Sequence, residues 1–275
     1  MPQRFRVAAV QFSAGEDSSA NRIRAERWVQ RAAEQGAALV VLPEMFHCWG
    51  RWDAMVASAE TVPGATHDWL AELARRHDVW LVAGSICERF DGEPRCFNTS
   101  LFFNPDGHLI SRYRKIHLFD AHVPGQAATM ESHWFAPGTE PVTVDTPLGR
   151  ISQAICYDLR FAELFLEYAR ESAELIVLPA AFTATTGRAH WETLIRARAI
   201  ETQSYIIAAN QVGRQAGTFE TYGHSLIVDP WGRVLADAGD QPGLALADID
   251  RTLLADIRRR LPVASHRRIG RAPLA

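Results

Sequence analysis

The sequence predicts an α/β fold in which two sheets pack face to face and helices cover their outer faces. Strand-like and helix-like segments alternate along the chain, and several strands, such as residues 38–42, are continuous apolar runs. Such runs are typical of strands that are covered on both faces. In addition, two stretches of the chain resemble each other, which predicts two similar halves and therefore a four-layer α-β-β-α sandwich.

The two similar stretches form an internal repeat of two segment pairs. In chain order, the paired segments are residues 41–46 with 177–182 (VLPEMF, VLPAAF) and residues 100–107 with 225–232 (SLFFNPDG, SLIVDPWG). The repeat breaks where Glu44 in the first copy corresponds to Ala180 in the second. We therefore expect two pseudo-symmetric halves that share a scaffold and differ in chemistry, with the active site at the strand ends between them.

Alternating and continuous apolar runs predict the strands of the first half. They lie at residues 5–12, 38–42, 79–85, 98–103 and 108–114. Asp17-Ser-Ser is expected to open a helix that Gly36 stops, and a second helix is predicted around residues 67–76. The buried face of the first helix is expected to hold Ile23, Trp28, Val29, Ala32 and Ala33. The last two strands flank an Asn-Pro-Asp-Gly turn, typical of a hairpin, and Lys115 follows the returning strand.

The second half is predicted from the same signals. Its strands are expected at residues 142–145, 150–156, 175–178, 205–209, 225–228, 233–236 and 244–249, and its helices at 160–170, 189–202 and 253–260. Residues 116–140 lack periodicity and contain the pairs Pro124-Gly125 and Pro137-Gly138, and so long a loop is often functional. We expect one domain over residues 1–262, followed by a basic tail over residues 263–275 that has no core pattern.

The composition is ordinary for a soluble globular protein, with 275 residues, 47% hydrophobic and 22% charged. A formal charge of −3 gives no reason to expect nucleic acid or an anionic membrane as a partner, and no apolar run is long enough to span a bilayer. The N-terminal residues indicate a strand and not a signal peptide. The four cysteines, Cys48, Cys87, Cys96 and Cys156, lack metal-ligand spacing, which favours a reduced, cytoplasmic protein with no bound metal.

Cys156 follows the apolar run of residues 151–155 and precedes a helical pattern. A thiol at a strand end lies near backbone N–H groups whose dipoles favour its ionised form, as a nucleophile requires. Alternatively, this cysteine is a small buried hydrophobe, which is the commoner role of a free cysteine.

Lys115 is the only lysine among 29 lysine and arginine residues. Arginine replaces lysine readily on a solvated surface, but not where a compact point charge on a flexible stem is needed. The lysine therefore indicates a functional ammonium, with a chance survivor on the surface as the alternative.

Glu44, Lys115 and Cys156 each follow a predicted strand. A cysteine that attacks a carbonyl needs a base to take its proton, and a carboxylate can serve. The tetrahedral intermediate needs positive charge or N–H donors at its oxygen. Lys115 and the backbone N–H of Tyr157 would supply them, so the three positions predict nucleophilic catalysis.

Three segments that contain these residues resemble the signature segments of the nitrilase superfamily of carbon–nitrogen hydrolases. They are residues 43–44 (PE), 113–119 (YRKIHLF) and 155–164 (ICYDLRFAEL). The similarity extends to residues 187–192, 196–201, 222–225, 229–232, 261–262 and 267–268. It is greatest to the Nit branch, which contains ω-amidases and deaminated-glutathione amidases. The resemblance implies a nitrilase-like α-β-β-α fold, a homodimer or higher homo-oligomer, and a Glu-Lys-Cys triad that works without a cofactor.

The resemblance also implies roles. Glu44 would be the general base, Lys115 would stabilise the oxyanion, and Cys156 would form a thioester. Glu131, within Met-Glu-Ser before the cysteine, would position the substrate or Lys115. Alternatively, Glu131 is a loop carboxylate paired with an arginine.

Other conspicuous residues have more modest interpretations. We expect Asp158 and Arg160 to form an ion pair at the helix start, or Arg160 to bind a substrate carboxylate. Loop residues Phe119, Phe182 and Thr183 are candidate pocket walls. The remaining side chains are expected to be structural: His117, His190, His224, Trp191 and Trp231, together with inert Cys48, Cys87 and Cys96.

The sequence thus predicts a hydrolase that cleaves a small carboxylate-bearing amide to an acid and ammonia through a thioester. An N-carbamoyl amine hydrolase or a nitrilase could use the same triad, and a binding or scaffold protein with an inactive site is an alternative of another class.

Overall fold

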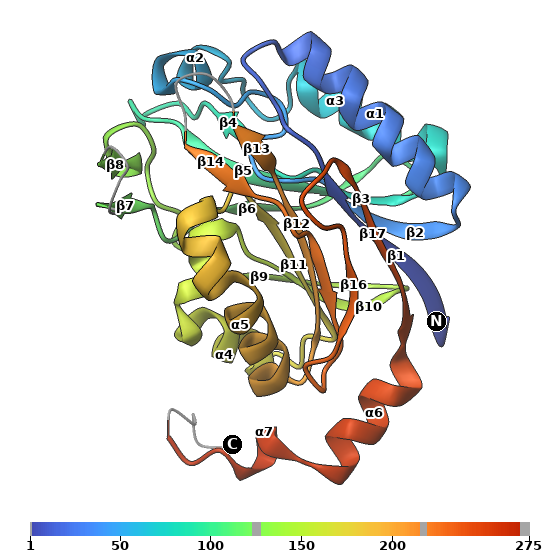
Figure 1. Cartoon of the computed structure of the whole chain (residues 1–275). Coiled ribbons are helices and arrows are strands. Elements are labelled where there is room, and N and C mark those ends of the chain that lie inside the picture. The colour runs from blue at the N-terminus through green and yellow to red at the C-terminus, as the bar shows by residue number, and fades with distance from the viewer. Residues whose placement is uncertain (1, 123–127, 215–218, 270–275) are drawn as a thin grey trace.

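The computed structural model describes residues 2–122, 128–214 and 219–269. It confirms the predicted four layers: two sheets face each other, helices α1 and α3 cover one outer face, and α4 and α5 cover the other (Figure 1). The long helices are α1 (Ser18–Glu34), α3 (Ala65–His77), α4 (Ala162–Arg170) and α5 (Ala184–Thr202).

The first sheet has the strand order β17-β1-β2-β3-β5-β4, and β6 pairs with β5. Its strands are β1 (Arg4–Gln11), β2 (Ala37–Val41), β3 (Trp80–Val82), β4 (Ile86–Glu88), β5 (Phe97–Phe103), β6 (Leu109–Arg114) and β17 (Gly243–Asp250). Strand β17 comes from the second half of the chain and pairs antiparallel with β1. The two halves are therefore linked by this one strand as well as by face-to-face packing.

The second sheet has the order β16-β15-β12-β11-β10-β9. Its strands are β9 (Val142–Thr146), β10 (Gly149–Gln153), β11 (Leu175–Ala180), β12 (Tyr205–Asn210), β15 (Leu226–Val228) and β16 (Val234–Asp237). Strands β2 and β11, which begin the two copies of the internal repeat, pack against each other across the interface between the sheets, with Val41 and Val177 in the shared core. Their ends therefore meet at the same edge of the sandwich.

Helix α1 begins as predicted, because the Asp17 side chain accepts a hydrogen bond from the Ala20 N–H at 3.0 Å. Its predicted buried face is wrong at Ile23, which is 54% exposed. Asn21 and Ala25 on either side of it are buried, and a residue two positions away lies on the opposite side of a 3.6-residue turn. Asn21 is buried because its amide donates to the carbonyls of Gly15 and His47.

Two boundaries in the second half differ from prediction. Strand β10 ends at Gln153, so Cys156 lies beyond the strand and opens the 3₁₀ turn η2 (Cys156–Arg160). Helix α5 begins at Ala184, before the predicted start at residue 189, and Thr183 caps it by accepting from the Thr186 N–H at 3.3 Å. Gly187 concealed the first turn because glycine is a poor helix former. Its helix nevertheless packs so closely on Tyr222 that an added Cβ would come within 2.4 Å.

Several short elements were not predicted. They are α2 (Trp52–Ala57), β7 (Asp120–Ala121), β8 (Thr129–Met130), η1 (Glu131–His133), β13 (Val212–Arg214), β14 (Glu220–Tyr222) and α7 (Val263–His266). Both Trp191 and Trp231 were expected to be packing residues; Trp191 is buried, but Trp231 is 54% exposed at a turn. Part of the predicted loop, Pro124-Gly125, and residues 270–275 of the predicted tail lie outside the described residues.

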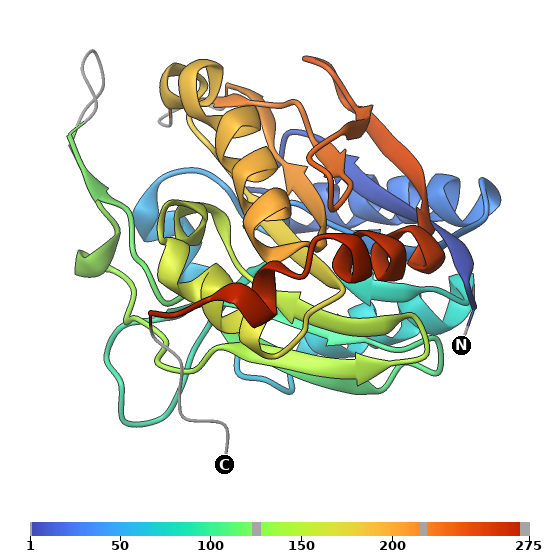
Figure 2. The ribbon, with the colours of Figure 1, turned by 90° about the horizontal axis from the view of Figure 1, so that it is seen from below.

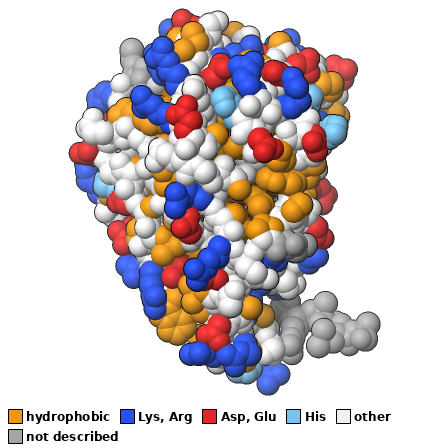
Figure 3. Space-filling view, turned by 90° about the vertical axis from the view of Figure 1, so that its right-hand side faces the viewer, with side chains coloured by type: hydrophobic (Ala, Val, Ile, Leu, Met, Phe, Trp, Pro, Cys, Tyr) orange, Lys and Arg blue, Asp and Glu red, His pale blue; other side chains and the backbone are white. Residues whose placement is uncertain are grey.

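Helices α6 (Arg251–Arg260) and α7 lie at one end of the sandwich (Figures 1 and 2). On the side that lies to the right in Figure 1, acidic and basic side chains are intermixed (Figure 3). Among the described residues, no helix is both long enough and apolar enough to cross a membrane.

Candidate active site

The sandwich brings the three residues that follow strands into one cavity. Glu44 comes after β2, Lys115 follows β6, and Cys156 follows β10, and they are 4%, 2% and 9% exposed. All three line one cavity where the strand ends meet. Glu131, from the loop between β6 and β9, lines it as well.

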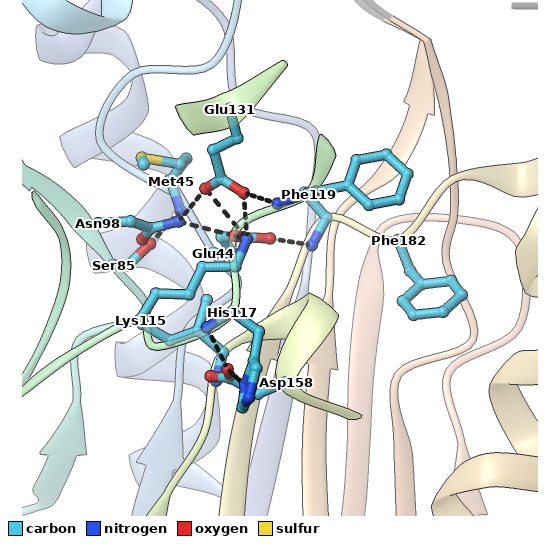
Figure 4. Close-up of polar contacts among 12 residues, drawn as sticks. Glu44, Met45, Ser85, Asn98, Lys115, His117, Phe119, Glu131, Asp158 and Phe182 are labelled. Atoms are coloured by element: carbon cyan, nitrogen blue, oxygen red, sulfur yellow. Dashed lines mark hydrogen bonds and ion pairs between the residues drawn. The ribbon is translucent and has the colours of Figure 1, made fainter. Parts of the chain in front are cut away.

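Both oxygens of the Glu44 carboxylate are held by donors. Oε1 accepts from Lys115 Nζ at 3.0 Å and from Asn98 Nδ2 at 2.8 Å, and Oε2 accepts from the backbone N–H of Ala181 at 2.8 Å (Figure 4). Ala181 lies in the second copy of the internal repeat, directly after Ala180, the counterpart of Glu44. The first copy therefore supplies the acid, and the second copy supplies a main-chain donor to it.

The backbone around Glu44 is fixed from two sides. Met45, with a φ of 51°, is in the left-handed region, and its N–H donates to Ser85 Oγ at 2.9 Å. Gln211 Nε2 donates to the Glu44 carbonyl at 2.9 Å. A non-glycine residue stays in this conformation only when its surroundings enforce it, and here they aim the Glu44 side chain into the cavity.

Lys115 lies between two carboxylates. Its ammonium donates to Glu131 Oε2 at 2.9 Å as well as to Glu44, and Glu131 Oε2 also accepts from the Phe119 N–H at 2.6 Å. Burial opposes the charge on Lys115, but Glu131 and Glu44 outweigh it and raise the pKa of the ammonium well above its ordinary value. The site therefore keeps a permanent positive charge.

Burial also raises the pKa of Glu131, with the Glu44 charge acting in the same direction and Lys115 against both. Two carboxylates share one ammonium, so the cluster carries an excess of negative charge when both are ionised. This carboxylate pair can therefore take up a proton in the cavity that also holds the Cys156 thiol.

Cys156 opens η2 with a φ of 46°, a strained value for a side-chain-bearing residue. Burial, followed by the nearby Glu44 carboxylate, raises the pKa of its thiol well above the ordinary value, against the influence of Lys115. The sequence-based expectation that the strand end favours the ionised form is therefore wrong for the resting site. The thiol is protonated and needs a base, which lies next to it.

The first turn of η2 also presents the Tyr157 N–H, and N–H groups at a helix start have no partner within the helix. Tyr157 lines the cavity, and its ring packs edge-on against Phe119 and Phe161, with centroids 5.0 and 5.2 Å away. Tyr157 and Lys115, the two residues expected to stabilise an oxyanion, therefore line the same cavity.

The expected ion pair between Asp158 and Arg160 is wrong. Asp158 is fully buried and accepts from the Tyr113 hydroxyl at 2.6 Å, the Ile155 N–H at 2.9 Å and the His117 N–H at 3.0 Å. These donors occupy both carboxylate oxygens, and because Tyr113 lies in β6 and His117 follows it, Asp158 ties the cysteine turn to the end of β6. Arg160 has its guanidinium 5.0 Å from the Phe182 ring centroid and lines the cavity instead.

The candidate wall residues Phe119, Phe182 and Thr183 all line the cavity, as does Arg160. Sequence reasoning missed the other lining residues: Met45, Trp49, Trp52, Met55, Asn98, Thr129, Ala181, Thr186 and Phe219. Asn98 opens a correctly predicted strand, but no pattern in the sequence marks it as part of the site. The tryptophans lie in a stretch without periodicity, so only the fold places them there.

The groups expected to be structural have mostly structural partners. His117 contacts Asp158 at 2.8 Å, His224 contacts Asp237 at 3.0 Å, and His190 lies 3.2 Å from Arg160. The other three cysteines are free and buried, and burial raises the pKa of each thiol. Within the described part of the chain, no group of three histidine, cysteine or acidic residues could hold a metal ion.

Comparisons with known proteins show which family the chain is similar to. The family described as "Carbon-nitrogen hydrolase" matches residues 6–259. The chain is 42% identical over 264 residues to the omega-amidase NIT2 of Homo sapiens, covering 96% of this chain and 95% of that protein. Among solved structures, the C. elegans NitFhit protein superposes with a TM-score of 0.89 at 39% identity, covering 97% of this chain and 65% of that one. Saccharomyces cerevisiae Nit3, of branch 10 of the nitrilase superfamily, gives 0.88 at 34% identity, with 98% of each chain covered.

Proposed function

The chain belongs to the carbon–nitrogen hydrolases of the nitrilase superfamily, and from this premise we propose that it is a cysteine-dependent amidase of the ω-amidase type. Its substrate is a small carboxylate-bearing amide, which it hydrolyses to the acid and ammonia. The observation that carries the proposal is the burial of a cysteine, Cys156, with a carboxylate, Glu44, and an ammonium, Lys115, in one cavity. A carboxylate near a thiol of raised pKa suits general-base activation.

In the acylation step, Cys156 Sγ attacks the amide carbon while Glu44 takes the thiol proton. The negative charge that develops on the amide oxygen is stabilised by Lys115 and by the Tyr157 N–H. Glu44 then gives its proton to the leaving nitrogen, the C–N bond breaks, and ammonia departs. The product is a thioester on Cys156.

In the deacylation step, Glu44 takes a proton from water, and the resulting hydroxide adds to the thioester carbonyl. The same two donors stabilise the second tetrahedral intermediate, which collapses with loss of the thiolate. Cys156 regains a proton from Glu44, and the acid leaves. Glu131 accepts a hydrogen bond from the Lys115 ammonium at 2.9 Å, so it is an auxiliary residue that positions this ammonium.

We assign to Arg160 the binding of the substrate carboxylate. This guanidinium lines the cavity, and its contacts are His190 Nδ1 and aromatic rings, with no carboxylate paired to it among the described residues. An arginine without an acidic partner favours an anionic ligand. Phe119, Phe182 and Thr183 form the walls that fix the substrate chain.

Ammonia release across a panel of compounds tests this function. We expect ω-amides of 2-oxo acids or deaminated glutathione to be hydrolysed, and N-carbamoyl amines and nitriles to react much more slowly. Cys156→Ala is expected to abolish ammonia release. A panel in which the carbamoyl compounds or nitriles lead would assign a different carbon–nitrogen hydrolase activity, and a fully inactive wild type would favour a binding protein.

We also propose that the protein works in the cytoplasm as a homodimer or higher homo-oligomer. The free thiols of all four cysteines suit a reducing compartment. Light scattering after size-exclusion chromatography tests the assembly, and a monomeric mass at micromolar concentration would contradict it.

A further inference from the structure

Asn98 is a buried residue of the site that sequence reasoning did not identify. It lies in β5, is 1% exposed and lines the cavity. The backbone carbonyl of Asn98 accepts a hydrogen bond from the backbone N–H of Lys115 at 2.9 Å. The β5–β6 hairpin therefore presents Asn98 and Lys115 side by side, both facing the same two carboxylates.

The Asn98 amide bridges those two carboxylates. Nδ2 donates to Glu44 Oε1 at 2.8 Å and to Glu131 Oε1 at 3.2 Å (Figure 4). One NH₂ group has two hydrogens, so both are used. The opposite amide orientation would place Oδ1 against two carboxylate oxygens, and electrostatic repulsion excludes it.

This orientation leaves Oδ1 as a buried acceptor without a donor among the described residues. An unsatisfied buried oxygen is unfavourable, and an apolar side chain would avoid it. The contact between Nδ2 and the two carboxylates is thus kept at the expense of an unpaired atom in the same side chain.

A neutral donor has a specific advantage here. A second cation would pair with Glu44 and weaken it as a base, whereas an amide orients the carboxylate and leaves its charge available. Because Asn98 donates to both Glu44 and Glu131, it also reduces the electrostatic repulsion between the two carboxylates.

We propose that Asn98 is a positioning residue that holds the Glu44 carboxylate aimed at the Cys156 thiol. The proposal rests on the role of Glu44 as the general base in the function proposed above. Loss of the Asn98 N–H groups removes stabilisation of the charged carboxylates, so their protonation moves to higher pH. The base is then protonated, and inactive, over a wider pH range.

The test compares Asn98→Leu, Asn98→Ser and Asn98→Asp with the control Ser100→Ala. Ser100 is two residues further along β5, is equally buried and does not line the cavity. We expect Asn98→Leu to lower kcat about 100-fold near pH 6 and about 10-fold near pH 8, with KM changed less than about threefold. The acidic limb of the pH–rate profile is expected to move to higher pH, most in Asn98→Asp and least in Asn98→Ser, whose hydroxyl retains one donor. Ser100→Ala keeps the wild-type profile.

The rate of Cys156 alkylation by iodoacetamide against pH is the second readout and requires no turnover. Its acidic limb is expected to shift in the same direction. Wild-type kcat in Asn98→Leu, or a loss that is uniform in pH with both limbs unmoved, overturns the proposal. Thermal unfolding shows whether Asn98→Leu folds. If it does not, the same criteria are applied to Asn98→Ser. A wild type that releases no ammonia but alkylates normally at Cys156 refutes the amidase function, whereas the alkylation limb still decides the role of Asn98.

Discussion

Two buried carboxylate clusters lie next to each other on the β5–β6 hairpin and differ in charge balance. In one, Glu88 of β4 accepts from Arg114 at 2.7 Å, Arg112 at 2.9 Å and Thr99 at 2.7 Å. In the other, Glu44 and Glu131 share Lys115 and Asn98. The hairpin residues of the two clusters are sequence neighbours, Asn98 with Thr99 and Arg114 with Lys115.

The balance determines what each cluster can do. Glu88 has two cations, and although burial would raise its pKa, the bonds from Arg114 and Thr99 hold the pKa below its ordinary value. Such a carboxylate stays ionised and anchors the hairpin. The neighbouring cluster has two carboxylates for one cation, so it can accept a proton from Cys156. An excess of buried negative charge therefore distinguishes the reactive cluster from the anchoring one.

Removing the single ammonium has the largest expected effect. Lys115→Met leaves Glu44 and Glu131 without a cation and the oxyanion without its charge. We expect kcat to fall about 10³-fold or more, as when an oxyanion donor is lost, and stability to fall by about 3–5 kcal/mol as for a broken buried pair. Steady-state kinetics and urea unfolding measure the two effects. Retention of a tenth of wild-type kcat would show that Lys115 does not stabilise the transition state.

Neutralising one of the two acids comes next. Glu131→Gln keeps the shape of the side chain and removes the excess negative charge, so Lys115 is held less firmly. We expect kcat to fall about 100-fold with little change in thermal stability. Glu131→Asp, which keeps the charge on a shorter stem, is the matched control and should retain more activity. A fully active Glu131→Gln would assign Glu131 to structure alone.

The anchoring cluster should respond in the opposite way. Glu88→Gln removes the anion from two arginines, and we expect a loss of about 2 kcal/mol in stability, reduced because both arginines are partly exposed. Activity per folded molecule should stay within about twofold of wild type because Glu88 touches no cavity-lining charge. A large fall in kcat with unchanged stability would contradict the distinction between the clusters.

The smallest expected effect is the pH dependence of that anchor. Because the pKa of Glu88 is lower in the folded than in the unfolded chain, its stabilisation is present above the ordinary value of 4.5 and is lost as the pH falls through the folded-state value. Wild type should therefore lose more stability than Glu88→Gln between about pH 6 and about pH 3. Urea unfolding at several pH values measures this, and parallel curves for the two proteins would refute it.

Strand ends were predictable because apolar runs end visibly in the sequence. The convergence of Glu44, Lys115 and Cys156 followed from those ends and from the repeat. The donors that shape the site were not predictable in the same way. The Ala181 N–H is main chain and carries no sequence signal, and Asn98 resembles any polar residue that begins a strand.

Two of the wrong predictions have a common cause, since each depended on a polar side chain whose partners come from other parts of the chain. Asp158 was assigned to its neighbour Arg160, but the folded chain brings Tyr113 and His117 to it. Ile23 was predicted to be buried because it is apolar, whereas the structure buries Asn21, whose amide donates to the carbonyls of Gly15 and His47. Local pattern determines the element, and tertiary contacts determine which polar groups are buried.

The most direct test of the account is the intact mass of the enzyme during turnover. Wild-type protein mixed with an ω-amide and quenched in acid at early times should carry an adduct equal to the product acid minus water, located on Cys156 by peptide mapping. The adduct should be absent from Cys156→Ala, which should also release no ammonia. Ammonia release by Cys156→Ala at the wild-type rate, with no adduct on either protein, would contradict the assignment of Cys156 as the nucleophile.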